Sequence, residues 1–220
     1  MGSSPTESPA AVSAPGELFT HDLGFNAPLV AGADEAGRGC LAGPIVAAAV
    51  LLNRDCLESE GAGRLAGIRD SKKLTAKARE RLYPEVLDCA VRVVVVMRSA
   101  RYIDANGLHV SNIECLAEAI RGLGSGPEAV TLVDGFALKG CEVPHRRLVK
   151  GDSTSAAVAS ASVIAKVTRD RCMARAGESY EGYGFEGHKG YASVAHRDAI
   201  RLLGPSPIHR MSFDSDAYRA

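Results

Sequence analysis

Two apolar runs joined by a glycine-rich turn constrain the fold of this chain more than any other feature. Residues 29–33 form the first run, and residues 45–52 form a second run in which every side chain is apolar. Short apolar runs bounded by turn residues are typical of strands that are buried within a sheet. We therefore predict two neighbouring strands here, with the second in a central position.

Strand-like and helix-like segments alternate along the rest of the chain, which predicts an α/β fold. Short apolar runs predict further strands at residues 91–96, 129–133 and 147–149. Helical apolar spacing or runs of small residues predict helices after the N-cap Thr75 and at residues 110–120, 153–176 and 193–203. Residues 54–67 are polar and contain several glycines, so we predict a loop there.

Composition excludes several classes of protein. The chain has 220 residues, enough for one sizeable core, and its formal net charge of zero gives no general sign of a nucleic-acid partner. The six cysteines occur singly, which argues against a zinc site and a disulfide scaffold. No apolar run is long enough to cross a membrane, and residues 1–20 lack the order of a secretion signal. We expect a cytoplasmic enzyme with a disordered N-terminal leader at residues 1–27.

Acidic residues follow three of the predicted strands and give the strongest indication of chemistry. These residues are Asp34, Glu35, Asp134 and Asp152. Ligands collect where strand ends converge, and converging carboxylates repel one another unless a cation neutralises them. We therefore predict that the four side chains hold Mg²⁺ or Mn²⁺. Two alternatives stay open, because Asp134 before a glycine also fits a turn and Asp152 also fits a helix N-cap.

A fifth acid, Asp170, is predicted to lie outside this site. It follows Asp152 by eighteen residues, and a continuous helix would separate the two by about 27 Å at roughly 1.5 Å per residue. We therefore assign Asp170 to a structural salt bridge with Arg169, Arg171 or the C-terminal region.

The turn after the first two acids has the sequence Gly37-Arg38-Gly39. Glycines allow the backbone N–H groups to approach a ligand closely, and the guanidinium group of the arginine can bind a phosphate or a sugar. Together with the acids, this turn indicates metal-assisted chemistry on a phosphodiester.

Several sequence blocks, taken together and in order, resemble bacterial ribonuclease HII, a member of the type 2 ribonuclease H family. The resemblance extends from about residue 29 to residue 213. The blocks are Asp34-Glu35-Ala-Gly-Arg-Gly, Asp70-Ser-Lys-Lys-Leu, Asn112-Ile, Asp134-Gly, Lys150-Gly-Asp, the segment from Ala159 through Asp170, Gly187-His-Lys-Gly-Tyr and Pro207-Ile-His-Arg-Met-Ser-Phe.

This resemblance implies a ribonuclease H-like fold, with a mixed central sheet flanked by helices and a C-terminal helical extension. The corresponding division is a leader at residues 1–27, a catalytic core at 28–176 and an extension at 177–220 that packs on the core. The implied activity is hydrolysis of RNA paired to DNA and cleavage 5′ of single ribonucleotides in duplex DNA, as in ribonucleotide excision repair. The resemblance also implies two metal ions and products with 3′-hydroxyl and 5′-phosphate ends.

By position, the family's acidic cluster corresponds to the four acids already selected, Asp34, Glu35, Asp134 and Asp152. In the family, the glycine-arginine-glycine turn grips the 2′-hydroxyl and the adjacent phosphates, and the tyrosine that corresponds to Tyr191 packs on the neighbouring deoxyribose. Ser71 and Lys72 are expected phosphate contacts, and His188, Lys189 and His209 are further candidates for contacts with the nucleic-acid backbone. The expected partners are therefore RNA–DNA hybrids and DNA with embedded ribonucleotides, bound by a monomer without a membrane.

Three other functions remain to be separated from this one. Ribonuclease HIII shares the acids, but it typically lacks this turn and the histidine-lysine-glycine-tyrosine block. A dinucleotide-binding oxidoreductase would need the Gly-x-Gly-x-x-Gly order, which the glycines from Gly32 to Gly39 do not follow. A non-catalytic nucleic-acid-binding protein would not be expected to place four acids beside phosphates.

Overall fold

The computed structural model describes residues 16–58, 60–68 and 74–219, and in this part of the chain five strands form one mixed sheet. The sheet order is β3-β2-β1-β4-β5. β1 pairs with β2 in antiparallel and with β4 in parallel orientation, and β5 is parallel to β4. The strands are β1 (Leu29–Ala36), β2 (Ile45–Asn53), β3 (Arg92–Arg98), β4 (Ala129–Asp134) and β5 (Arg146–Leu148). The predicted mixed central sheet is confirmed.

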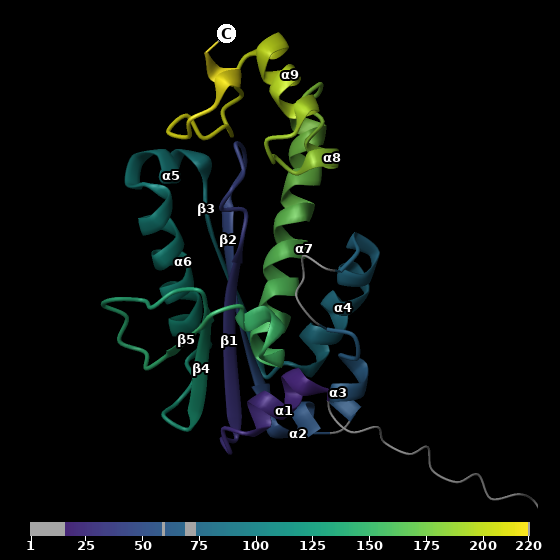
Figure 1. The fold of residues 1–220 in the computed structure, drawn as a ribbon, viewed down its shortest axis with the longest axis vertical. Helices are drawn as coiled ribbons and strands as arrows, with labels where there is room; N and C mark the ends of the chain where they lie inside the picture. The colour runs from purple at the N-terminus through teal and green to yellow at the C-terminus, as the bar shows by residue number, and fades with distance from the viewer. Residues whose placement is uncertain (1–15, 59, 69–73, 220) are drawn as a thin grey trace, which may run out of the picture.

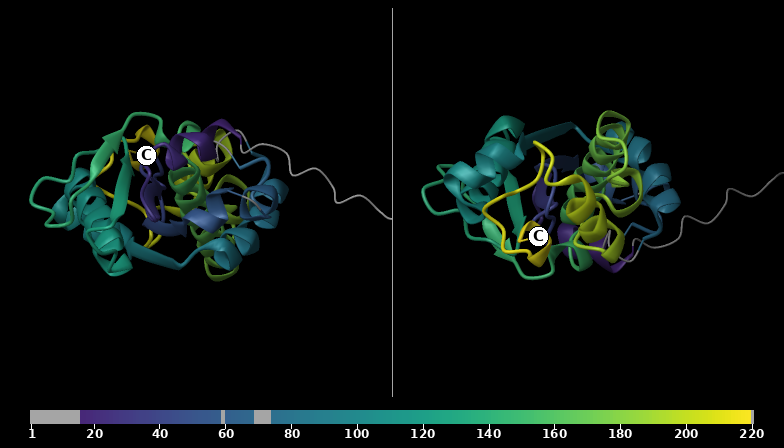
Figure 2. Two further views of the ribbon diagram at one scale, coloured as in Figure 1. Left: turned by 90° about the horizontal axis from the view of Figure 1, so that it is seen from below. Right: turned by 90° about the horizontal axis from the view of Figure 1, so that it is seen from above.

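Helices cover both faces of the sheet (Figures 1 and 2). One core lies between the sheet and α7, α4 and the short helices α1–α3, and a second core lies between the sheet and α5 and α6. The helices are α1 (Glu17–Leu23), α2 (Arg54–Glu58), α3 (Glu60–Arg64), α4 (Ala76–Cys89), α5 (Ala100–Asn106), α6 (Leu108–Leu123), α7 (Ala156–Ser179), α8 (Phe185–His188) and α9 (Val194–Leu203). In this part of the chain, no helix has the length and apolar character needed to cross a membrane.

Small residues let α7 approach the centre of the sheet closely. Its first ten residues are alanine, serine, valine or isoleucine, and all of them are buried. Gly32 of β1 lies directly beneath the helix: a Cβ atom at this position would lie 2.1 Å from the carbonyl carbon of Ala157. This contact brings the backbone at the start of α7 against the strand that carries Asp34.

The structure differs from the sequence prediction at residues 54–67, where two short helices replace the expected loop. Cys56, Leu57 and Leu65 are buried in the core beneath α7. Burial of these apolar side chains therefore outweighs the weak helix propensity of the nearby glycines. The other predicted strands and helices are found close to their expected positions, including the Thr75 N-cap, whose hydroxyl accepts a hydrogen bond from Ala78 N.

The predicted disorder of residues 1–27 is wrong for residues 17–23. Glu17–Leu23 form α1, and the side chain of Asp22 in this helix is fully buried. Asp22 Oδ2 accepts hydrogen bonds from Ser155 Oγ at 3.0 Å and from Ala157 N at 2.9 Å, so α1 holds the start of α7. Local composition did not reveal this helix, because Asp22 accepts hydrogen bonds from donors that lie more than 130 positions away in the sequence. Residues 1–15 lie outside the described residues.

Candidate active site

Asp34 and Asp134 lie side by side at the carboxyl ends of β1 and β4. The parallel register pairs Ala33 with Val133, so each aspartate is the next residue along its strand. Both face the α7 side of the sheet, because Val30 of β1 and Leu132 of β4 pack in the core on that side and side chains alternate along a strand. Burial raises the pKa of Asp34 to about 7, and the nearby Asp134 and Asp152 carboxylates contribute to the rise.

Asp152 reaches the same site from the turn that precedes α7. It is buried within the 3₁₀ turn Gly151–Ser153, which begins after the left-handed residue Lys150. Gly151 N donates a hydrogen bond of 2.6 Å to Asp134 Oδ1 and so joins this turn to the end of β4. Ser155, not Asp152, caps α7, because its hydroxyl accepts from Val158 N. Asp152 is therefore not the N-cap of α7.

Glu35 points away from the three aspartates. As the next residue of β1 after Asp34, its side chain lies on the opposite side of the strand, toward α6. Its Oε1 lies 3.6 Å from Arg38 Nη1, and only 9% of its side chain is exposed. The structure thus brings Asp34, Asp134 and Asp152 together and leaves Glu35 beside them at the strand end.

The donor set fits a hard divalent cation. Carboxylate oxygens are the ligands that Mg²⁺ and Mn²⁺ prefer. Burial is the main cause of the raised pKa of Asp34, and the negative charge of Asp134 and Asp152, which a cation would neutralise, adds to it. Among the described residues, no three Asp, Glu, His or Cys side chains are already gathered as ligands of one ion. Asp34 Oδ1 instead accepts a hydrogen bond from Glu35 N at 2.7 Å, and Asp134 accepts one from Gly151 N.

The Gly37-Arg38-Gly39 turn forms one wall of a cleft next to these acids. Gly37 has a φ of 97°, which favours glycine, and a Cβ atom there would lie 2.0 Å from Arg169 Nε. Gly39 has no heavy atom within 4 Å of its Cβ position, so its backbone is open to a ligand. The Arg38 side chain is 44% exposed, and its guanidinium carbon lies 4.7 Å from the centre of the Phe136 ring.

Tyr191 forms the opposite wall and belongs to the C-terminal extension. It forms an antiparallel bridge with Cys40, and Leu41 N donates to Gly190 O at 2.9 Å. Tyr191 is 42% exposed. A pocket of about 200 Å³ lies between the two walls, lined by Glu35, Ala36, Gly37, Arg38, Gly39, Lys166 and Tyr191.

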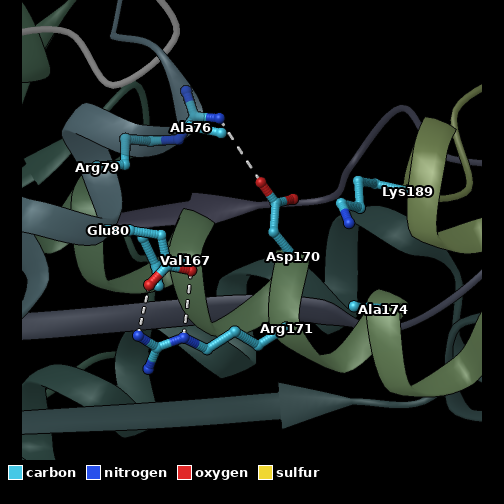
Figure 3. A pocket seen from close by; sticks show the side chains of 8 residues that line it. All are labelled: Ala76, Arg79, Glu80, Val167, Asp170, Arg171, Ala174 and Lys189. Carbon is cyan, nitrogen blue, oxygen red and sulfur yellow. Dashed lines mark hydrogen bonds and ion pairs between the residues drawn. The ribbon is translucent and has the colours of Figure 1, made fainter.

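Lys166 lines this pocket, and sequence reasoning missed it. Its Nζ lies 5.4 Å from the centre of the Tyr191 ring and 2.6 Å from Asp170 Oδ1. Asp170 Oδ2 lies 3.7 Å from Arg79 Nη2, and this ion pair joins α7 to α4 (Figure 3). The salt-bridge role predicted for Asp170 is present, but Lys166 and Arg79 are its partners. The four-residue spacing of Lys166 and Asp170 is the signal that could have indicated the pair.

The remaining predicted contacts have separate outcomes. Ser71 and Lys72 lie outside the described residues. His209 is buried, and its Nδ1 accepts from Ser206 N at 2.8 Å. His188 Nε2 lies 2.7 Å from Tyr183 O, and Lys189 Nζ donates to Glu186 O. In this structure, these three side chains therefore make internal contacts.

Known proteins resemble the chain over nearly its whole described length. The Ribonuclease HII family model matches residues 31–216. A ribonuclease HII from Salinispora arenicola is 48% identical over 185 residues, covering 84% of this chain and 66% of the relative. A ribonuclease HII from Mycobacteroides abscessus is 47% identical over 184 residues, covering 84% of this chain and 76% of the relative.

Solved structures agree with these sequence relatives. The ribonuclease HII in the PCNA:RNase HII complex from Archaeoglobus fulgidus has a TM-score of 0.71 and 29% identity, covering 85% of this chain and 96% of that one. Bst-RNase HIII, solved in complex with Mn²⁺, has a TM-score of 0.67 at 20% identity, covering 92% of this chain and 71% of that one, and so shares the fold. The chain therefore belongs to the ribonuclease HII family of ribonuclease H hydrolases.

Proposed function

We propose that this chain hydrolyses the RNA strand of RNA–DNA hybrids and also cuts on the 5′ side of single ribonucleotides in duplex DNA. The observation that carries the proposal is the convergence of Asp34, Asp134 and Asp152 beside a cleft with an arginine on one wall and a tyrosine on the other. Family membership supports the reaction class. We further propose that the chain works as a cytoplasmic monomer in ribonucleotide excision repair.

Asp34, Glu35, Asp134 and Asp152 would hold two Mg²⁺ or Mn²⁺ ions. Two such ions lower the pKa of a water molecule and stabilise the negative charge of the leaving 3′-oxygen. The four carboxylates would hold the ions beside the scissile phosphate. Water would add to the phosphorus as the P–O3′ bond breaks, so that O3′ leaves as the 3′-hydroxyl and the phosphate stays on the 5′ end of the other product. Glu35 would have to turn from Arg38 toward the aspartates, because its side chain now lies on the other side of β1.

Recognition of the ribonucleotide would come from the cleft walls. The open backbone at Gly39 and the exposed Arg38 guanidinium suit the 2′-hydroxyl and the adjacent phosphates. The exposed part of Tyr191 suits packing on the next deoxyribose, where a ribose would add a 2′-hydroxyl. Lys166 lies close enough to both walls to contact a phosphate in the pocket.

The test is cleavage of a labelled duplex with one ribonucleotide, with the product ends mapped and Mg²⁺ and Mn²⁺ titrated separately. A cut 5′ of the ribonucleotide that requires the metal and disappears in Asp134→Asn supports the proposal. Cleavage that persists in EDTA and in that variant would refute it, and a cut elsewhere would refute the roles of Tyr191 and Arg38.

A further inference from the structure

Arg169 is a fully buried guanidinium group that contacts both walls of the cleft. It extends from α7 and has no exposed surface. Its Nε donates to Pro44 O at 3.0 Å and its Nη2 to Ala42 O at 3.0 Å, both just beyond the Gly-Arg-Gly turn. Its Nη1 donates to Lys189 O at 2.9 Å, two residues before Tyr191.

The surrounding contacts give this guanidinium little freedom. Gly37 packs directly on it, since a Cβ atom at Gly37 would lie 2.0 Å from Arg169 Nε. The guanidinium carbon also lies 5.8 Å from the centre of the Tyr191 ring. A planar fork can reach three carbonyl oxygens in fixed directions, whereas a lysine ammonium is a single point on a flexible chain. Lysine at this position would therefore keep the charge but could not make all three hydrogen bonds, and the walls would be joined mainly by the backbone contacts between Cys40–Leu41 and Gly190–Tyr191.

A second buried arginine, which lies in the C-terminal extension itself, has side-chain acceptors on one wall only and so provides a comparison within the same molecule. Arg210 is fully buried, and its Nε and Nη2 donate to Gly43 O at 3.0 and 2.9 Å. Its Nη1 donates to Arg38 O at 3.0 Å. All three of these hydrogen bonds go to the wall that contains the Gly-Arg-Gly turn.

We propose that Arg169 is a positioning residue that fixes the Gly-Arg-Gly turn and Tyr191 at one separation, and so sets how strongly the enzyme prefers a ribonucleotide–deoxyribonucleotide junction. This inference rests on the proposed function. The turn would locate the ribonucleotide, and Tyr191 would test the next sugar. A change of separation moves one contact relative to the other, and small displacements in such sites change rates by up to about a hundredfold.

The experiment compares two substrates, a DNA duplex with one ribonucleotide and a continuous RNA–DNA hybrid. The quantity measured is the ratio of kcat/KM for the first to kcat/KM for the second. In Arg169→Lys we expect this ratio to fall on the order of tenfold, while hybrid cleavage persists. The matched control is Arg171→Lys. Arg171 lies two residues after Arg169 on the same helix, but its side chain is half exposed and pairs with Glu80 (Figure 3). The control should keep the wild-type ratio.

A double-mutant cycle separates positioning from general structural damage. If Arg169 acts through Tyr191, the variant Arg169→Lys/Tyr191→Ala should have the same ratio as Tyr191→Ala alone. Arg210→Lys should lower cleavage of both substrates, and its effect on the ratio should add to that of Tyr191→Ala. Circular dichroism and thermal melting of each variant check that it is folded. If Arg169→Lys does not fold, Arg210→Lys and its double mutant with Tyr191→Ala still test whether contacts to one wall alone set the ratio.

Several outcomes would overturn the inference. An unchanged ratio in folded Arg169→Lys, an equal fall in Arg171→Lys, or additive effects with Tyr191→Ala would each do so. For Arg210→Lys, the outcome against the inference is a fall in the kcat/KM ratio that is not additive with the effect of Tyr191→Ala. It would show that contacts to one wall are enough to set the preference between the two substrates. A wild-type enzyme that cuts neither substrate would instead refute the proposed function itself.

Discussion

Replacing Asp22 by alanine should destabilise the whole catalytic core, although this residue lies in a segment whose sequence indicates disorder. Asp22 Oδ2 accepts hydrogen bonds from Ser155 Oγ and Ala157 N at the start of α7. The substitution leaves a buried N–H group and a buried hydroxyl without this acceptor. Two hydrogen bonds to a carboxylate contribute roughly 1.5 kcal/mol each at the low end of the measured range, or about 3 kcal/mol together.

Burial of the carboxylate offsets part of this contribution. Desolvation raises the pKa of Asp22 even though the hydrogen bonds from Ala157, His21 and Ser155 oppose the rise. We therefore expect a net loss of about 2 kcal/mol in the free energy of unfolding, which lowers Tm by roughly 4–8 °C in a domain of this size. The same loosening at the start of α7 should raise the Mg²⁺ concentration needed for half-maximal cleavage, because Asp152 lies in the preceding turn.

The measurement is thermal and urea unfolding of the purified variant, with Asp198→Ala as the control. Asp198 is also paired, with Arg201 at 2.7 Å, but its side chain is 60% exposed, so its loss should cost under about 0.5 kcal/mol. A variant Asp22→Ala that melts within 2 °C of the wild type, about the smallest shift expected for 1 kcal/mol, would refute the reasoning. Deletion of residues 1–27 should be at least as damaging, since it removes α1 together with Asp22.

Four other changes have defined outcomes. Gly32→Ala should cost about 3 kcal/mol, measured by urea unfolding, because its Cβ atom would collide with the backbone of Ala157; wild-type stability would contradict the close packing. Lys166→Met should reduce the slope of log affinity against log salt by about 1 in a binding titration if Lys166 contacts a phosphate; an unchanged slope would exclude that contact. Asp34→Asn should abolish cleavage. The metal-free variant should be at least as stable as the wild type, because the substitution removes a charge that faces Asp134 and Asp152. A strongly lowered Tm in EDTA would argue against repulsion among these carboxylates. Burial lowers the pKa of His196 from 6.5 to about 4. Between these pH values the unfolded chain therefore binds more protons than the folded one, so the free energy of unfolding should fall as the pH drops through this window. In His196→Gln, Tm should fall less steeply over the same pH range.

The sequence predicts the sheet and the aspartate cluster well because both depend on local patterns. Apolar runs locate β1 and β2, and an acid at each strand end needs only the parallel pairing of β1 with β4 to become a cluster. The direction of Glu35 is already implied by alternation along β1. Proximity to Asp34 in sequence nevertheless suggested a shared site, and the structure places the two side chains on opposite sides of the strand.

The parts that the sequence does not reveal depend on contacts between distant segments. Asp22 meets α7 across 133 and 135 positions, and Arg169 reaches Ala42 across 127. Lys166 has an ordinary helical spacing to Asp170, so only the fold distinguishes it from an exposed surface pair. No local propensity encodes these long-range contacts, which explains why the roles of Arg169 and Lys166 became visible only in three dimensions.

The close seating of α7 on the sheet links catalysis to substrate choice. The turn with Asp152 precedes this helix, and Lys166 and Arg169 follow about 15–20 Å further along it, at roughly 1.5 Å per residue. Any tilt of the helix would therefore move both Asp152 and the cleft wall that contains Tyr191. Engineering of this enzyme toward a new preference should leave the alanine-rich half of α7 untouched and vary Tyr191 and its neighbours, where one property can change while the other is kept.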